Sequence, residues 1–187
     1  MEKKDVLLKI AREVIAKELG VEYSVDIQKL REQNSWLDDK GTVFVTLNTK
    51  SNHNLRGCIG SIIAHRSLYE DLVHNAKSAA FDDPRFPPLK QEEFNDISIE
   101  VSILSEPQLV TYDTIDDLKN KIRVGEDGVI LKLNGYQATF LPQVWRELSS
   151  FELFMSHLCQ KAGMHSDCLR YKPQIYTYKV QEYQEED

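Results

Sequence analysis

Apolar residues recur every three or four positions in several stretches of the chain, which is the spacing of an amphipathic helix. These stretches cover residues 5–19, 26–30, 68–80, 114–122 and 151–162. Ser67 with Glu70 and Ser149 with Glu152 have the spacing of a capping box, in which a hydroxyl and a carboxylate each bond a free backbone amide. The sequence therefore predicts five helices. The basic side chains of the first are expected largely in water: Lys3, Lys9, Arg12 and Lys17.

Strand signals lie between the helices. Alternating or β-branched apolar runs cover residues 42–47, 55–63, 97–103, 129–133, 136–141 and 175–180. The first two runs form a hairpin across a polar loop. Asn134-Gly135 joins the fourth run to the fifth, since this pair supplies the positive φ angles of a type I′ turn. Short connections between strands favour an α+β fold, with a mainly antiparallel sheet flanked by helices. The acidic end of the chain is expected to be loose.

Composition and charge narrow the class of protein. The chain of 187 residues is 41% hydrophobic and 28% charged, as in an ordinary globular protein. Its net charge of −7 argues against a general nucleic-acid binder, which needs a basic surface to displace phosphate counterions. No apolar stretch is long enough to cross a membrane. The first 20 residues carry too many charges for a secretory signal. The three cysteines show no disulfide framework, so a reduced, cytoplasmic setting is expected.

The hexapeptide Leu55-Arg56-Gly57-Cys58-Ile59-Gly60 is the strongest candidate for chemistry. Two glycines within a strand indicate a bend, or a surface that something approaches closely. Arg56 beside Cys58 would lower the pKa of the thiol and favour a reactive thiolate. The alternative is that Cys58 is a small buried apolar residue, as free cysteines often are.

Two later positions could complete a site with the hexapeptide. The loop from Phe81 to Pro88 contains two phenylalanines, which should fix it to the core and hold Arg85 in place. Glu100, in the middle of a strand, is either solvated or the partner of an arginine. Arg56, Cys58, Arg85 and Glu100 are far apart in sequence, but adjacent strands and this loop could bring them together.

Other familiar chemistries lack their signatures in this sequence. Phosphate-loop, dinucleotide-loop, nucleophile-elbow and HExxH patterns are all missing. The nearest approach to a metal-ligand set matches no compact zinc spacing: His157, Cys159, His165 and Cys168. We therefore expect neither a metal nor a cofactor.

Several segments together resemble the AMMECR family, which is named for an Alport-syndrome chromosomal region. Its prokaryotic members are called AmmeMemoRadiSam system protein A. The hexapeptide and the loop Asp83-Pro84-Arg85-Phe86-Pro87-Pro88 carry the resemblance most specifically. Further similar segments are Ile99–Ser102, Gly128–Leu131, Phe140–Trp145 and His157–Gly163.

The resemblance implies a fold more clearly than a function. It implies one AMMECR-type domain over residues 1–187 with two lobes of unequal size and a cleft between them. The larger lobe would hold residues 1–110 and 144–187, and the smaller one residues 111–143. The family motif carries over onto residues of the hexapeptide and the loop: Arg56, Gly57, Cys58, Gly60, Asp83, Arg85 and Phe86. The resemblance also implies an association with Memo-like and radical SAM proteins in a modification pathway.

Three functions remain open on the sequence. The leading hypothesis is a ligand- or partner-binding module, in which Arg56 and Arg85 hold an anionic group because a guanidinium fork matches carboxylate or phosphate geometry. Gly57 and Gly60 would let backbone amides approach that group. The second is an enzyme with Cys58 as nucleophile and Glu100 as proton carrier. The third is a protein-interaction scaffold without a pocket.

Overall fold

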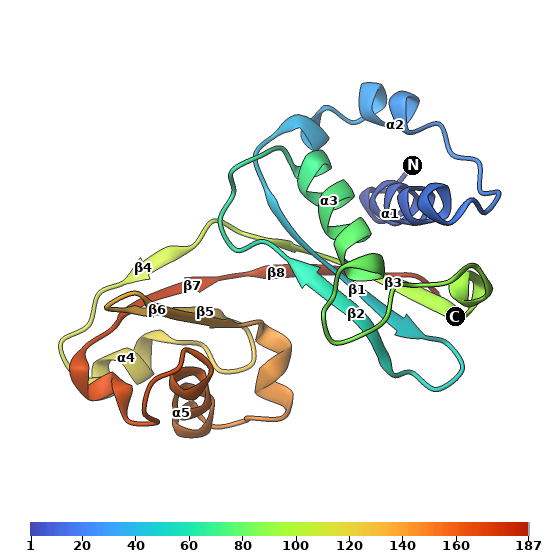
Figure 1. Cartoon of the computed structure of the whole chain (residues 1–187). Helices are drawn as coiled ribbons and strands as arrows, with labels where there is room; N and C mark the ends of the chain where they lie inside the picture. The colour runs from blue at the N-terminus through green and yellow to red at the C-terminus, as the bar shows by residue number, and fades with distance from the viewer. Residues whose placement is uncertain (187) are drawn as a thin grey trace. The chain divides into compact units, whose positions relative to one another are not determined.

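A computed structural model describes residues 1–186 of the chain (Figure 1). Its contacts divide the chain into a first unit, Met1–Leu104 with Gln181–Asp187, and a second unit, Ser105–Val180. Each unit has its own four-stranded antiparallel sheet and its own apolar core. The predicted α+β fold is therefore confirmed.

The first unit packs helices on one face of a sheet with strand order β2-β1-β3-β8 (Figure 1). Its strands are β1 (Thr42–Thr49), β2 (Leu55–Gly60), β3 (Ile97–Leu104) and β8 (Val180–Gln184). Its helices are α1 (Lys3–Leu19), α2 (Ile27–Gln33) and α3 (Leu68–Phe81), with short 3-10 turns η1 (Ser35–Asp38) and η2 (Gln91–Asp96). Alternate residues of β1 and β3 are fully buried in one core with α1 and α3.

The second unit has strand order β4-β7-β5-β6, and α4 and α5 lie on one side of this sheet (Figure 1). Its strands are β4 (Gln108–Val110), β5 (Gly128–Leu133), β6 (Tyr136–Phe140) and β7 (Gln174–Tyr178). Its helices are α4 (Ile115–Lys121) and α5 (Phe151–Lys161), with 3-10 turns η3 (Pro142–Arg146) and η4 (Cys168–Tyr171). Phe154 of α5 anchors the core, because its ring stacks 3.6 Å from that of Trp145 and meets the ring of Phe140 edge-on.

The local chemistry of turns and helix starts follows the sequence closely. Asn134 (φ 50°) and Gly135 (φ 85°) form the predicted turn between β5 and β6. The capping box of Ser67 and Glu70 begins α3 as predicted. For α5 the prediction was wrong by one residue: the hydroxyl of Ser150, not Ser149, accepts a hydrogen bond from the amide of Leu153.

The acidic tail up to Glu186 was expected to be loose, but Glu185 is fixed by hydrogen bonds, and Asp187 lies outside the described residues. One final strand was predicted over residues 175–180. The structure has two strands there: β7 belongs to the sheet of the second unit, and β8 begins at Val180 and belongs to the sheet of the first unit. After β8, Glu185 forms two 2.6 Å hydrogen bonds with the guanidinium of Arg12 on α1. Arg12 is 9% exposed and not in water as predicted, and the carbonyls of Phe94 and Ile97 accept two further hydrogen bonds from it.

The two units also differ from the expected lobes. Residues 144–180 belong to the second unit and not with the chain ends, because α5 and β7 pack into the second core.

Cys159 and Cys168 form a disulfide with 5.8 Å between their Cα atoms, although the sequence showed no disulfide framework. The spacing did not reveal it because α5 ends and the chain turns back between the two cysteines. The expected cleft between lobes stays a prediction. Among residues 1–186 no helix is both long and apolar enough to span a membrane.

Candidate functional site

The hexapeptide is strand β2, at one edge of the first sheet. Both of its glycines lie where a neighbour occupies the space of a side chain. A Cβ atom on Gly57 would meet the backbone carbonyl of Ala79 in α3, and one on Gly60 would meet the ring of Phe44 on β1. These contacts give both glycines a packing role, since only a residue without a side chain allows such an approach. A ligand role for Gly57 or Gly60 stays a prediction.

Cys58 lies in a row of polar side chains across three strands. Thr46 on β1 pairs with Cys58 on β2 and with Glu100 on β3. Directly paired residues project from the same face of a sheet, so these three side chains are neighbours. The Thr46 hydroxyl lies 3.3 Å from the sulfur of Cys58. Cys58 is a free, half-buried thiol. The structure therefore brings together Cys58 and Glu100 as the sequence predicted.

Asp83 connects this strand to the loop after α3. Its carboxylate, 4% exposed, accepts a 3.0 Å hydrogen bond from the backbone amide of Cys58. It also accepts hydrogen bonds from Nε (3.0 Å) and Nη2 (2.8 Å) of Arg85. Nη2 of Arg85 in turn donates to the carbonyl of Cys58, at 3.3 Å. Asp83 and Arg85 thus occupy the edge of β2 that has no neighbouring strand, at the position of the thiol.

Arg56 takes no part in this arrangement. Its Nε and Nη2 bind both carboxylate oxygens of Glu93, at 2.8 and 3.1 Å, and Nη2 also donates to the carbonyl of Pro87. The side chain is 9% exposed, whereas that of Arg85 is 55% exposed. Both guanidiniums contact the ring of Phe86: that of Arg56 lies 5.9 Å from the ring centre and that of Arg85 lies 5.5 Å from it.

The electrostatics of Cys58 differ from the prediction that Arg56 lowers its pKa. Burial raises the pKa of the Cys58 thiol, and the opposing effects of the Thr46 hydrogen bond and the Arg85 charge are smaller. The carboxylates of Glu100 and Asp83 raise it further. The hydrogen bond from Arg85 holds the pKa of Asp83 far below its ordinary value, so Asp83 is a permanent anion at neutral pH. The predicted activation of Cys58 by Arg56 is therefore wrong.

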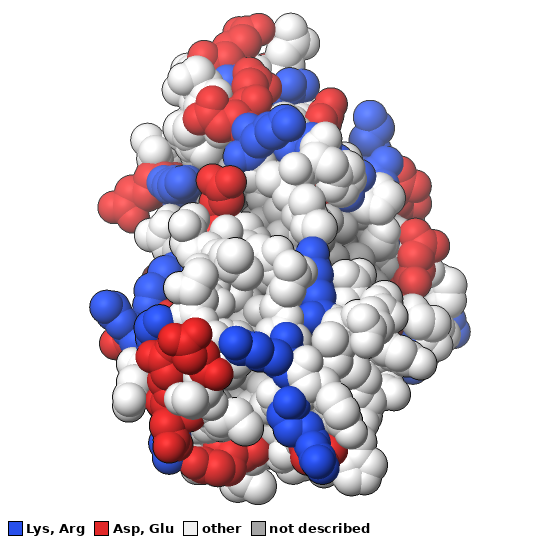
Figure 2. All heavy atoms as spheres, turned by 90° about the vertical axis from the view of Figure 1, so that its left-hand side faces the viewer, with Lys and Arg blue, Asp and Glu red and all other residues white. Residues whose placement is uncertain are grey.

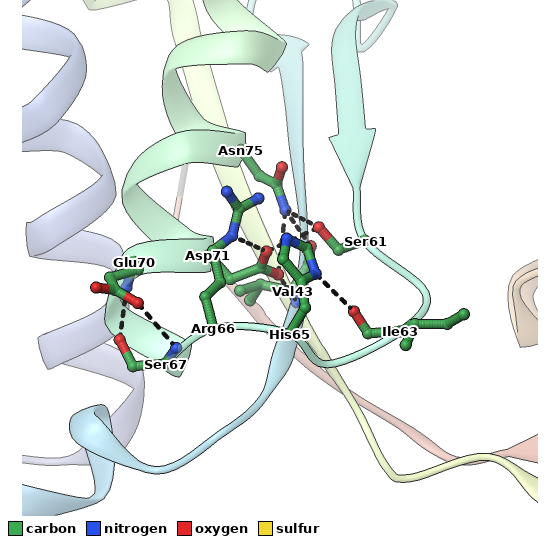
Figure 3. Close-up of polar contacts among 9 residues, drawn as sticks. All are labelled: Val43, Ser61, Ile63, His65, Arg66, Ser67, Glu70, Asp71 and Asn75. Atoms are coloured by element: carbon green, nitrogen blue, oxygen red, sulfur yellow. Dashed lines mark hydrogen bonds and ion pairs between the residues drawn. The ribbon is translucent and has the colours of Figure 1, made fainter.

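A third arginine–carboxylate pair lies just beyond β2, and the sequence did not reveal it (Figure 3). Asp71 of α3 is fully buried and accepts hydrogen bonds from the Val43 amide, the Ser61 hydroxyl and Nε of Arg66, all at 2.7–2.8 Å. Asn75 donates to the Val43 carbonyl and to Ser61 in the same network. The sequence did contain a signal for this network: Asp71 and Asn75 are polar, lie four positions apart, and fall on the apolar face of a predicted helix.

The remaining polar candidates do not join the site. Cys159 and Cys168 are oxidised to a disulfide, so they and the two nearby histidines are not a ligand set. Within residues 1–186 no group of His, Cys, Asp and Glu has the arrangement of a metal site. Figure 2 shows one face of the molecule, where basic and acidic side chains are interspersed in small groups between uncharged areas.

Comparison with known proteins gives consistent matches over nearly the whole chain. A family model described as AMMECR1 matches residues 8–183. Protein NEQ441 of Nanoarchaeum equitans is 35% identical over 183 residues, which cover 96% of this chain and 99% of that protein. A protein of Methanothermobacter thermautotrophicus is 43% identical over 140 residues, 74% of this chain and 71% of its own. The crystal structure of uncharacterized protein PH0010 from Pyrococcus horikoshii has a TM-score of 0.84 at 35% identity and covers 96% of this chain and 90% of that chain.

Proposed function

The chain belongs to the AMMECR1 family, and we propose that it is a binding module that receives the anionic group of a ligand at Arg85, beside Cys58. One observation carries this proposal. The buried carboxylate of Asp83 fixes both the Cys58 backbone and the Arg85 guanidinium, while more than half of the Arg85 side chain stays exposed. A charged group that is already held in its binding geometry loses little conformational entropy when a ligand arrives.

Arg85 is better suited to this role than Arg56, the other arginine that the sequence singled out. Both oxygens of Glu93 occupy the fork of Arg56, so a ligand would have to break a half-buried ion pair to reach it. Asp83 holds Nε and Nη2 of Arg85 in the same bidentate way, but the Arg85 side chain is 55% exposed and that of Arg56 only 9%, so a ligand can reach Arg85 without breaking its ion pair. We assign Arg56 to holding Phe86 and the loop, and Arg85 to the ligand.

Binding of inorganic phosphate and of citrate, measured by isothermal titration calorimetry, tests the proposal. We expect Arg85→Gln to weaken binding by at least about tenfold, because one charge-assisted contact contributes about 1.5–3 kcal/mol. Arg123→Gln is the matched control, since Arg123 is 72% exposed in the second unit.

Because Arg85→Gln leaves Asp83 without its cation, Arg85→Lys is measured alongside. The lysine keeps the positive charge but cannot form the bidentate contact of a guanidinium. The affinity of Arg85→Lys for the anion should therefore lie between that of Arg85→Gln and that of the Arg123→Gln control. Equal affinities of all variants for both anions, with unchanged thermal melting, would contradict the proposal.

A catalytic role for Cys58 has less support. A nucleophilic cysteine needs a lowered pKa or an adjacent base, whereas burial raises the pKa of this thiol. The histidines that could have served as base are exposed: His53, His65 and His74. An interaction scaffold is compatible with the fold but does not explain why a rigid, exposed arginine lies beside a free thiol.

The wider setting is also a proposal. Family resemblance supports work alongside Memo-like and radical SAM proteins in a modification pathway. The expected cytoplasmic setting was based on the lack of a disulfide framework, and the Cys159–Cys168 disulfide removes that support. Co-purification of the intact chain with a Memo-like protein, with and without Arg85→Gln, tests whether the anion site contributes to that association.

A further inference from the structure

A second recess lies entirely within the second unit, and it is independent of the proposed anion site. It has a volume of about 590 Å³ and lies between the β5–β6 turn and the segment that follows α5. This size is in the range of small-molecule sites in proteins. Its walls include Leu133, Tyr136, Met164, His165, Cys168 and Tyr171.

Two tyrosines at this recess are unusually exposed for large aromatic side chains. Tyr136 is 52% exposed and Tyr171 is 63% exposed. Their hydroxyl groups make no hydrogen bond with any other residue of the described chain, 1–186. Exposed tyrosines that the fold does not use are typical of recognition surfaces, where they supply contact area at low conformational cost.

The walls of the recess are held in place by covalent and polar contacts. The disulfide ties Cys168 to Cys159 at the end of α5. Asp167 binds both His165, at 2.9 Å, and Arg170, at 3.1 Å. The Arg170 guanidinium lies 5.5 Å from the centre of the Tyr171 ring, within the range of a cation–π contact. These contacts connect one wall of the recess, residues 165–171, to the end of α5.

We propose that this recess binds a neutral aromatic ring. None of the side chains that line it is an aspartate, glutamate, lysine or arginine, in a chain of which 28% of residues are charged. Tyrosine rings and the sulfur of Met164 make favourable contacts with aromatic groups. Asn134 and His165 supply hydrogen-bonding groups at the rim, which suits a ring that carries a hydroxyl or amide.

Titration of the isotope-labelled intact chain with p-cresol, followed by amide NMR shifts, tests the proposal. We expect saturable shifts in residues 133–136 and 163–171, with a Kd of about 1 mM for so small a ligand. Tyr171→Ala should raise that Kd at least about tenfold, whereas Tyr171→Phe should keep it within about twofold, because the ring is retained. Cyclohexanol is the matched non-aromatic ligand and should bind more weakly than p-cresol.

The aromatic ring could come from a free small molecule or from a side chain of a polypeptide. N-acetyl-tyrosinamide distinguishes these sources. Tighter binding than p-cresol supports a polypeptide, and equal or weaker binding supports a free small molecule. Shifts that do not saturate, or equal affinities for p-cresol in Tyr171→Ala and the unmodified chain, would overturn the proposal. The spectrum of each variant also shows whether it is folded.

Discussion

Arg56 and Cys58 are two positions apart on one strand, so a regular strand would place both side chains on one face. The pairing of β1 with β2 is irregular at this point: Leu47 pairs with Gly57, but Asn48 pairs with Leu55, so Arg56 is the extra residue of a bulge. A bulge redirects the side chain of the residue that it inserts. This local change sends the guanidinium of Arg56 to Glu93 and leaves the charge near Cys58 to Arg85.

The raised pKa of Cys58 predicts slow alkylation at neutral pH. Only the thiolate reacts with iodoacetamide, and a higher pKa leaves less thiolate at pH 7. The rate should therefore be below that of the unfolded chain at pH 7, and its midpoint should lie at a higher pH than that of an ordinary thiol. Mass spectrometry across a pH series measures this directly.

Thr46→Val is the matched variant for that experiment, because it keeps the shape of the side chain and removes the hydroxyl beside the sulfur. Since this hydrogen bond lowers the pKa of Cys58, its loss should move the midpoint to still higher pH. A midpoint below that of an ordinary thiol would instead restore the hypothesis of a cysteine nucleophile.

At the scale of elements, β2 is an edge strand whose exposed backbone is covered by a loop. Exposed sheet edges can pair with other chains, and proteins often cover them. Here Asp83 and Arg85 bind the amide and carbonyl of Cys58, and the carbonyl of Pro87 binds Arg56. The proline-rich sequence suits this task, because proline has no amide with which to extend the sheet. Protection of the edge and presentation of Arg85 are thus properties of the same loop.

The opposite end of β2 depends on Asp71, which joins α3 to β1 and to the segment after Gly60 (Figure 3). Asp71→Asn should lower the free energy of unfolding by about 3 kcal/mol, because it leaves Arg66 without its charge partner and a buried network incomplete. Urea denaturation measures the loss. Glu70→Gln, in the exposed capping box one residue earlier, should cost less than about 0.5 kcal/mol, because a glutamine oxygen can still accept the hydrogen bond from the Ser67 amide. Similar losses for the two variants would show that the buried network contributes little.

The elements were more predictable than the contacts among them. Periodicity, caps and the Asn134-Gly135 turn are local signals, and they located the helices and both hairpins. The pairings of Asp83 with Cys58 and of Glu185 with Arg12 join residues 25 and 173 positions apart, so no local pattern encodes them. The sequence therefore predicted several residues that the structure brings together, among them Cys58, Asp83 and Arg85, but it named Arg56 and not Arg85 as the charge that acts on Cys58.

At the scale of the whole molecule, the first unit is closed by the end of the chain. The backbone of Glu185 donates to the Ile99 carbonyl, and its carboxylate accepts from the Ile99 amide and from Arg12. Glu185→Gln should lower the free energy of unfolding by about 2–3 kcal/mol, because a largely buried arginine loses its charge partner.

Glu186 is the matched control for this variant. Its side chain is 92% exposed, so Glu186→Gln should change stability by less than about 0.5 kcal/mol. Hydrogen exchange followed by NMR measures both variants residue by residue. The loss for Glu185→Gln should be concentrated in α1, β3 and β8, and a uniform or absent change would show that the tail is not a structural element.

The disulfide should stabilise the second unit specifically, because both cysteines lie in its core. A cross-link between residues nine positions apart contributes about 2–3 kcal/mol to the free energy of unfolding by restricting the unfolded chain.

Each unit contains one tryptophan, so Trp36→Phe leaves Trp145 as the fluorescent reporter of the second unit. In that background, Cys159→Ala with Cys168→Ala should shift the fluorescence transition to lower urea by the corresponding amount. Cys58→Ala should leave it in place, since Cys58 belongs to the first unit. If the double variant unfolds with the same midpoint as its parent, the cross-link has no stabilising role and the rigid wall inferred for the aromatic recess loses its covalent support.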